Sequence, residues 1–227
     1  MAELAIAALL FVGTHFALSS PTLRPPLVAR FGERLFTGLY SLLQILLLVW
    51  LVRSYATAPF SPVWSPPGWT AWIPLIAMAP ALLLMVGGLI QPNPTAVMQD
   101  AKGPPDVAPR GILAVTRHPV MWAFALWALS HVAANGDAAS IVLFGALAAL
   151  ALIGTRAIDA KKRIRWGAAW PDFAARTSNL PLGAVAAGRA QLDFAGVGWR
   201  TPVIAAAVYA ALILLHPLII GVPALPG

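Results

Sequence analysis

The sequence predicts an all-α integral membrane protein that forms one domain over residues 1–227, a bundle of about six transmembrane helices. Hydrophobic residues make up 59% of the chain and charged residues only 10%, whereas a soluble domain carries about 25% charged residues. The apolar residues are also gathered into stretches long enough to cross a bilayer. Nearly all basic residues fall in alternate connections between these stretches.

These stretches give the predicted spans in order. A helix of about 20 mostly apolar residues crosses the hydrocarbon core. The stretches lie near residues 2–20, 36–52, 71–90, 118–135, 139–157 and 201–220. Glu3 is the only charged residue before Arg24, so the first stretch is expected to be a retained helix and not a signal peptide. Asn135-Gly136-Asp137 predicts a tight turn that joins the fourth and fifth spans as an antiparallel hairpin.

The basic residues predict the orientation of the bundle. With six spans, the loops after the first, third and fifth share one face, and of the 15 Lys and Arg residues only Arg53 falls on the other face. Basic loops stay in the cytoplasm, so both termini are expected to be periplasmic. This topology accounts for the formal charge of +7. It predicts membrane lipid as a partner and no nucleic acid.

The longest connection, residues 158–199, contains a basic and aromatic pattern. Lys161 and its basic neighbours precede Trp166, Trp170 and Phe173, which are spaced as on one face of a helix. The pattern predicts a short amphipathic helix on the inner membrane surface, with its basic end near anionic lipid. An ordinary topology anchor explains the same residues.

The four histidines are the main candidates for chemistry: His15, His118, His131 and His216. All lie in or at the ends of predicted spans, where ionisable residues are costly and often functional. The alternative is a neutral histidine that joins two helices by hydrogen bonds. His118 and His131 lie ~20 Å apart along one helix and on different faces, so they cannot bind one metal ion. A two-histidine site therefore needs His15 or His216, and estimated depth favours the pairs His131/His216 and His15/His118.

Other candidates are fewer. Arg117 suits a carboxylate or phosphate ligand, or serves as an interfacial anchor, and Asp137 is interpreted as a turn residue. The chain has no cysteine, which excludes thiolate ligands and covalent haem attachment, so any haem would be non-covalent. No phosphate-binding, dinucleotide-binding or metalloprotease motif is present.

Several segments together resemble the NnrU family. They are FVGTHFALSSPTLRPPLVARFGE, GLYSLLQ, TRHP running into WALSHVAANGD, WPDFAARTSNLP and HPLIIGVP, and they extend from about residue 5 to 225. The resemblance implies a bacterial inner-membrane protein associated with denitrification and nitrogen oxides. The same domain forms the core of the plant 15-cis-zeta-carotene isomerase, a haem b enzyme.

That relative implies a ligand set for haem. Its two implicated ligands match His15 and His131, and a third histidine matches His118. Depth alone favours other pairs, and here the motif match takes precedence. Imidazoles on different helices can hold haem iron in an apolar bundle, and Arg117 could hold a propionate. Nitric oxide or a small apolar polyene would then be the substrate class.

A more distant resemblance links the chain to isoprenylcysteine carboxyl methyltransferases and phospholipid methyltransferases, which use S-adenosylmethionine. It rests on TRHP, the helical hairpin and Asp159 followed by WGAAWPDFAARTSNLP. The acidic pair of those enzymes is reduced to Asp159-Ala160, and Met121 replaces a common aromatic residue; both departures count against methyl transfer. The alternatives to haem are therefore a methyltransferase-like protein using Arg117, His118 and Asp159, or a non-enzymatic partner of nitric oxide or nitrite reductase.

Overall fold

A computed structural model describes residues 1–96 and 109–225 of the chain, and this part is helical with no β-strand. The long helices are α1 (Ala2–Ser19), α3 (Glu33–Ala56), α4 (Trp72–Ile90), α6 (Pro119–Asn135), α7 (Ala138–Trp166) and α11 (Arg200–Ile219). The short ones are α2 (Arg24–Phe31), α5 (Ile112–Val115), α8 (Trp170–Arg176), α9 (Gly183–Ala186) and α10 (Phe194–Val197), with 3-10 turns at Gly68–Ala71 and Gly167–Ala169.

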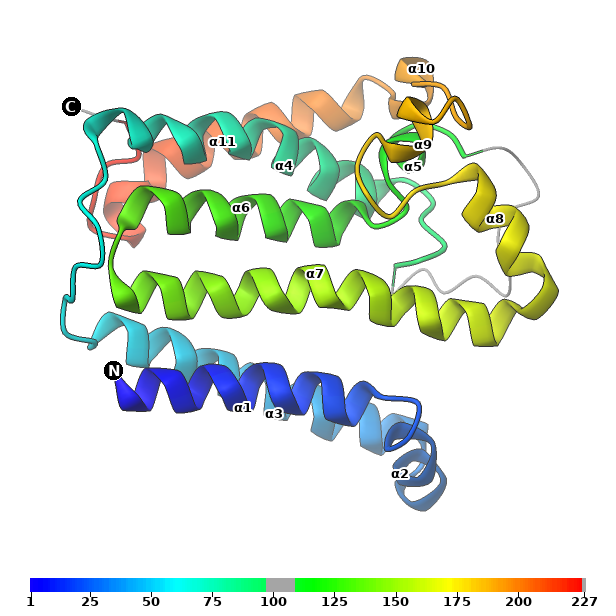
Figure 1. The fold of residues 1–227 in the computed structure, drawn as a ribbon, viewed down its shortest axis with the longest axis horizontal. Helices are drawn as coiled ribbons and strands as arrows, with labels where there is room; N and C mark the ends of the chain where they lie inside the picture. The colour runs from blue at the N-terminus through cyan, green and yellow to red at the C-terminus, as the bar shows by residue number, and fades with distance from the viewer. Residues whose placement is uncertain (97–108, 226–227) are drawn as a thin grey trace.

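The long helices confirm the predicted membrane fold. Among the described residues, five helical segments are long and apolar enough to cross a membrane. They include α1, α3, α4, α7 and α11. The remaining predicted span is α6, whose 17 residues lie at the short end of the range for a spanning helix. It runs beside α7 and α4 (Figure 1), so the predicted total of about six agrees with the architecture.

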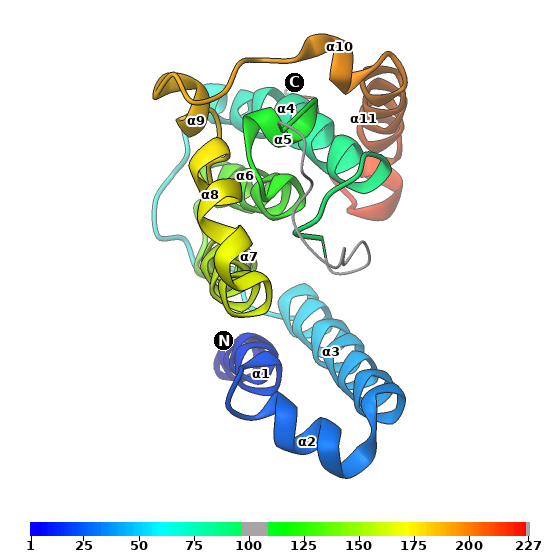
Figure 2. The same ribbon diagram turned by 90° about the vertical axis from the view of Figure 1, so that its right-hand side faces the viewer.

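The helices follow an open arc when viewed along their axes (Figure 2). Helix α11 packs on α4, α4 on α6, α6 on α7, α7 on α1, and α1 on α3. The largest buried apolar cluster lies where α1, α3, α6 and α7 meet, and includes Leu4, Phe11, Leu51 and Phe144. Most other large apolar side chains are exposed, as expected where the surrounding solvent is lipid.

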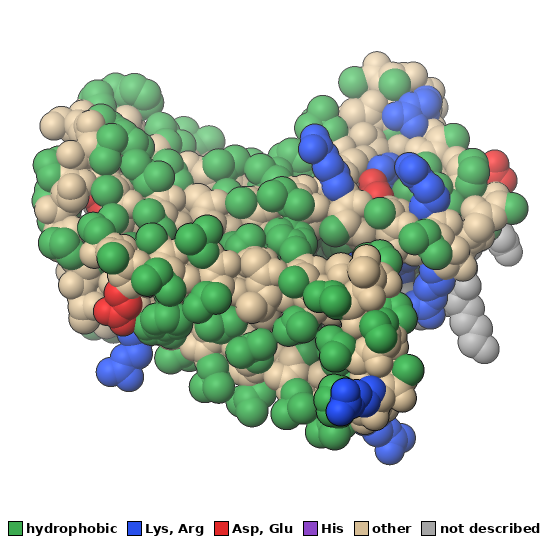
Figure 3. Space-filling model, turned by 60° about the horizontal axis from the view of Figure 1, so that its bottom comes forward, with side chains coloured by type: hydrophobic (Ala, Val, Ile, Leu, Met, Phe, Trp, Pro, Cys, Tyr) green, Lys and Arg blue, Asp and Glu red, His purple; other side chains and the backbone are tan. Residues whose placement is uncertain are grey.

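Charge is segregated along the bundle. Figure 1 shows the start of α1 and the end of α11 at the same end, opposite α2 and α8. In the space-filling view, hydrophobic side chains cover the middle, and Lys and Arg side chains gather mainly at the end opposite the termini (Figure 3). This arrangement agrees with the predicted one-sided distribution. Lys102, assigned to the basic face, lies outside the described residues.

The hairpin turn between α6 and α7 is confirmed in detail. Gly136 has φ +72° and would place a Cβ 2.5 Å from the carbonyl oxygen of Trp64, so only glycine fits. The Asp137 carboxylate accepts a hydrogen bond of 3.0 Å from the Ser140 backbone N–H and caps α7. Asp137 therefore has the structural role that its sequence context predicts.

The predicted amphipathic helix in residues 158–199 is wrong in its boundaries. Helix α7 continues without a break to Trp166, so the basic residues from Lys161 onward extend a spanning helix. The chain then bends at Gly167, which has φ +52°. This bend packs Trp166, Trp170 and Phe173 against one another in a buried cluster, where they stabilise the join of α7 and α8 and cannot face lipid.

Helices α4 and α6 approach closely at Gly88. A Cβ at this position would lie 2.8 Å from Pro119 Cγ and 2.8 Å from Val120 Cγ2, and small residues permit such approach between membrane helices. We expect Gly88→Val to lower the free energy of unfolding by about 1–3 kcal/mol, because the added methyl groups must push α4 from α6. Thermal unfolding of the detergent-purified protein measures this change.

Gly145 of α7 provides the matched control for Gly88. It is also a helical glycine, but a Cβ there would meet no atom within 4 Å. Gly145→Val should therefore change stability little. Equal unfolding temperatures for the two variants would contradict the close packing of α4 on α6.

Candidate functional site

The main polar cluster lies at the basic end of the bundle and joins Arg117, His118 and Asp159. Arg117 donates to both carboxylate oxygens of Asp159, from Nε to Oδ1 at 2.9 Å and from Nη2 to Oδ2 at 2.5 Å. His118 donates from Nε2 to Oδ1 at 2.6 Å. One carboxylate of α7 is thus shared by two side chains at the start of α6.

Local sequence explains how these groups converge. His118 is the N-cap of α6 and Pro119 is its first residue, a position that suits proline. The preceding segment is held by the chain after α8, because Arg117 N–H donates to the Ser178 carbonyl at 2.9 Å and Thr116 Oγ1 donates to the Asn179 carbonyl at 2.6 Å. These two hydrogen bonds hold the backbone of the TRHP segment in place, and the Arg117 and His118 side chains extend from it to Asp159 of α7.

Burial makes this cluster costly to open. The exposed fractions of the side chains are 12% for Arg117, 14% for Asp159 and 1% for His118. Trp170 lies beneath the Arg117 guanidinium, 5.4 Å from ring centroid to Cζ, at cation–π distance. His118 Nδ1 is buried without a hydrogen-bond partner. The arrangement can neutralise buried charge and hold three described chain segments together.

Asn179 is a member of this site that sequence reasoning missed. Its side chain donates to Asp159 Oδ2 at 3.5 Å, and its carbonyl accepts from Trp122 Nε1 at 2.7 Å. The only sequence signal is its place in the segment WPDFAARTSNLP, which was used for the resemblance and not for chemistry.

A second polar network closes the same end of the bundle. Asp193 accepts hydrogen bonds from the backbone N–H groups of Gly196 at 2.8 Å and Gly111 at 3.2 Å. These bonds hold the pKa of the Asp193 carboxyl below its usual value. Gln91 donates to the Val197 carbonyl at 2.9 Å. This network attaches the start of α11 to the end of α4, and its contacts are those of a structural support.

His15 lies between α1 and α3, away from this cluster. Its Nδ1 is 3.1 Å from the Tyr40 hydroxyl, and Gln44 of α3 lies beside the imidazole. Gln44 also donates to the Thr14 hydroxyl at 3.0 Å. The neighbours of His15 are thus polar α3 side chains, as expected for a histidine that joins two helices.

His131 has a different environment on α6. Its Nδ1 is 2.7 Å from the Trp127 carbonyl oxygen. A carbonyl can only accept, so Nδ1 carries the proton and, in the neutral imidazole, Nε2 carries the lone pair. The ring packs against Phe144 and Trp127, with centroid distances of 5.0 and 5.6 Å. His131 therefore has an unprotonated Nε2 in its neutral form and lies among aromatic rings.

The structure does not bring the predicted ligands His15 and His131 into contact. His15 is ~20 Å from the start of α1 and His131 is ~6 Å from the end of α6, using the helical rise. Those two helix ends lie at the same end of the bundle (Figure 1), so the residues differ in depth by roughly 14 Å. His216 of α11 is near enough to His131 for positive charge on one to disfavour positive charge on the other, and its Nδ1 is 2.7 Å from the Val222 carbonyl oxygen.

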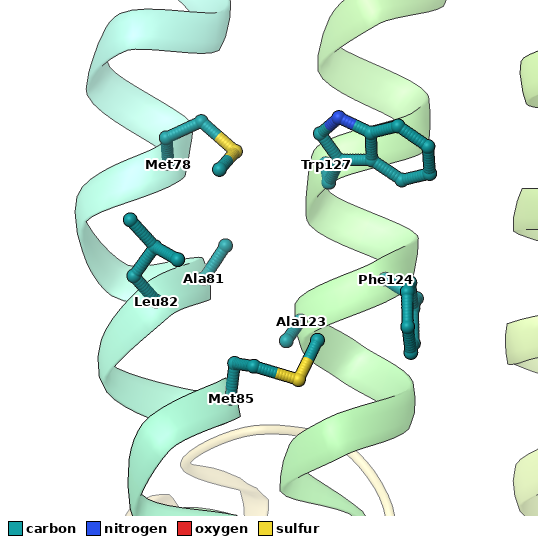
Figure 4. Close-up of a pocket in the computed structure, with 7 residues that line it drawn as sticks. All are labelled: Met78, Ala81, Leu82, Met85, Ala123, Phe124 and Trp127. Carbon is teal, nitrogen blue, oxygen red and sulfur yellow. The ribbon is translucent and has the colours of Figure 1, made fainter. Parts of the chain in front are cut away.

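An apolar hollow lies between α4 and α6. It has a volume of about 190 Å³ and is lined by Met78, Ala81, Leu82 and Met85 of α4 and by Ala123, Phe124 and Trp127 of α6 (Figure 4). Trp127 lies one helical turn before His131. In the described part of the chain, no three His, Asp or Glu side chains form a group that could hold a bare metal ion.

Comparison with known proteins gives one clear relationship. The family model described as NnrU protein matches residues 3–224. Neither the curated proteins nor the solved structures yielded a match. The match covers nearly the whole chain and includes every helix described above. The chain therefore belongs to the NnrU family.

Proposed function

We propose that this NnrU protein binds haem b in the membrane and that His131 is an axial ligand of the iron. The hydrogen bond from His131 Nδ1 to the Trp127 carbonyl carries the proposal. Histidines that bind metals usually donate their second nitrogen to a carbonyl or carboxylate, which fixes the tautomer and the ring orientation. Nε2 of His131 has the lone pair that iron needs.

The size of the hollow limits how a porphyrin would fit. Cofactor pockets usually measure about 300–1,000 Å³, and the hollow beside Trp127 has about 190 Å³. A porphyrin bound through His131 would therefore extend beyond the hollow, over the lipid-facing surface of α4 and α6. The residues fit haem as a ligand and an apolar wall, and they do not form a complete cavity.

Two histidines are candidates for the second ligand of the iron. Family resemblance favours His15, which requires the roughly 14 Å difference in depth to be removed by helix movement. Position in the bundle favours His216, because His131 and His216 lie near the ends of α6 and α11, and these helix ends lie at the same end of the bundle (Figure 1). Arg117 and His118 remain secondary candidates for contact with the cofactor, although hydrogen bonds to Asp159 occupy Arg117 Nε and His118 Nε2.

Bound haem iron would supply a site for nitric oxide or for polarising a polyene double bond, in keeping with nitrogen-oxide handling or cis–trans isomerisation. We propose an inner-membrane location with both termini in the periplasm, which the basic end formed by α2 and α8 supports. A supporting role beside nitric oxide or nitrite reductase is an alternative, and no contact in the described residues favours it.

The methyltransferase-like alternative has one observation in its favour. Arg117, His118 and Asp159, the residues it requires, do come together. However, both Asp159 oxygens already accept hydrogen bonds from the other two side chains. Binding of S-adenosylmethionine at this site would require the cluster to open.

An absorption spectrum tests these functions first. We expect protein purified in detergent from haem-supplemented cells to show a Soret band, and dithionite reduction to sharpen the α and β bands of a b-type haem. Haem iron with two imidazole ligands gives a six-coordinate spectrum, and haem iron with one imidazole ligand gives a five-coordinate spectrum. Folded protein without a Soret band would overturn the haem proposal, and S-adenosylmethionine binding by that protein would favour the alternative.

A further inference from the structure

A second apolar groove lies at the basic end of the bundle, between the end of α1, α2 and α3. Its volume is about 190 Å³, and its lining includes Leu18, Leu27, Phe31, Phe36, Leu39 and Tyr40. Phe36 and Tyr40 stack on one side, with centroids 6.1 Å apart and planes at 11°. These rings form an apolar wall, and Leu27 and Phe31 of α2 line the groove at the basic end of the bundle.

Basic side chains from two helices converge at the mouth of this groove. The Arg24 guanidinium of α2 lies over the Phe36 ring, 5.6 Å from its centroid, and interacts electrostatically with Tyr40. Helix α7 packs against α1 and α3, and its Lys161 is close enough to Arg24 and His15 for their positive charges to repel one another. Lys161 therefore belongs to the same mouth, although it is distant in sequence.

The charge at the mouth is not balanced by the acidic residue beside it. Glu33 pairs with Arg24 at 2.6 Å. Lys161 adds a second positive charge, and Arg30 lies 5.7 Å from the centroid of Phe31, another lining residue. Arg24 and Lys161 together carry more positive charge than Glu33 balances, and this favours binding of an anion. An apolar groove below them favours an occupant with a hydrocarbon chain.

We propose that this groove binds an anionic phospholipid, with its phosphate between Arg24 and Lys161 and an acyl chain along Phe36 and Leu39. Charge complementarity selects the anionic headgroup, since each basic residue near a membrane surface attracts such lipids. The apolar lining of the open groove favours an occupant with an acyl chain. The groove does not include the proposed haem ligand His131 or the α4–α6 hollow, although Tyr40 of its lining contacts His15, a candidate for the second ligand.

The lipid would link two parts of the arc. Arg24 belongs to the α1–α3 pair, whereas Lys161 belongs to α7, which joins that pair to the remaining helices. A phosphate held by both would strengthen this connection at the cytoplasmic end. Binding should therefore raise the thermal stability of the whole protein.

The test compares phosphatidylglycerol with phosphatidylcholine of the same acyl chains, added to delipidated protein in detergent. Bound lipid is measured by native mass spectrometry and stability by thermal unfolding. We expect phosphatidylglycerol to bind more tightly. Lys161→Gln, which leaves the Arg24–Glu33 pair intact, should weaken it about fivefold, and Arg24→Gln/Lys161→Gln about 25-fold.

Arg156→Gln/Arg163→Gln is the matched control for the lipid site. This double variant removes two positive charges, as Arg24→Gln/Lys161→Gln does, and both of its residues lie in the basic part of α7. The two arginines are exposed. At 100° per residue, they point roughly 140° and 160° away from Lys161 around the helix axis. Unchanged phosphatidylglycerol binding is expected. Equal binding of the two lipids by wild type would overturn the proposal in favour of a neutral apolar occupant. Equal losses in control and test variants would indicate only general attraction to the basic surface.

Discussion

Replacing His131 with alanine is expected to remove most of the haem from the purified protein. The imidazole is held for binding by the 2.7 Å hydrogen bond to the Trp127 carbonyl, and alanine has no ligand to offer. Loss even of an outer-shell partner commonly lowers metal affinity 10–100-fold, so loss of the ligand should lower haem content at least about tenfold. The ratio of Soret to protein absorbance measures it.

His118→Ala is the control for this experiment. His118 Nε2 donates to Asp159, so its loss should affect stability and leave haem in the protein that remains folded. His15→Ala and His216→Ala then identify the second ligand, through a change from a six- to a five-coordinate spectrum. A folded His131→Ala protein with its full haem complement would remove His131 from the site.

Much of the fold follows from local sequence. The length of each apolar stretch predicts a membrane span. The Asn135-Gly136-Asp137 turn predicts the α6–α7 hairpin, and the basic loops predict one charged end of the bundle. The predicted amphipathic helix after Lys161 was wrong because the spacing of the aromatic residues suits a lipid-facing helix as well as it suits a buried cluster. The bend at Gly167, which turns Trp166 and Trp170 toward each other, depends on a positive φ that spacing does not reveal.

The candidate site was predictable only in part. Arg117 and His118 were found because they are adjacent, and Asp159 only through a distant resemblance. Asn179 reaches the site because the chain after α8 folds back onto TRHP, a tertiary arrangement without a sequence period. Span positions predict similar depths for His131 and His216, and the ends of α6 and α11 do lie at the same end of the bundle (Figure 1). The partners of His15 on α3 could not be read from α1 alone.

Replacing Asp159 with alanine is expected to cause the largest loss of stability. Alanine would leave the Arg117 guanidinium and His118 without their shared acceptor, although these side chains are only 12% and 1% exposed. Breaking a buried ion pair by removing one partner typically costs about 3–5 kcal/mol. We expect the unfolding temperature in detergent to fall by on the order of 10 °C, measured by fluorescence-detected thermal unfolding.

Two further variants separate the ion pair from a general effect of charge. Asp172→Ala removes an exposed acidic residue from α8 at the same end of the bundle and should change stability little. Arg117→Met/Asp159→Leu removes both partners, and because apolar replacement of a whole buried pair is often neutral, it should recover part of the loss. If Asp159→Ala were as stable as Asp172→Ala, water would have to reach Arg117 and His118. The cluster would then be an accessible pocket, which is the property that the S-adenosylmethionine alternative requires.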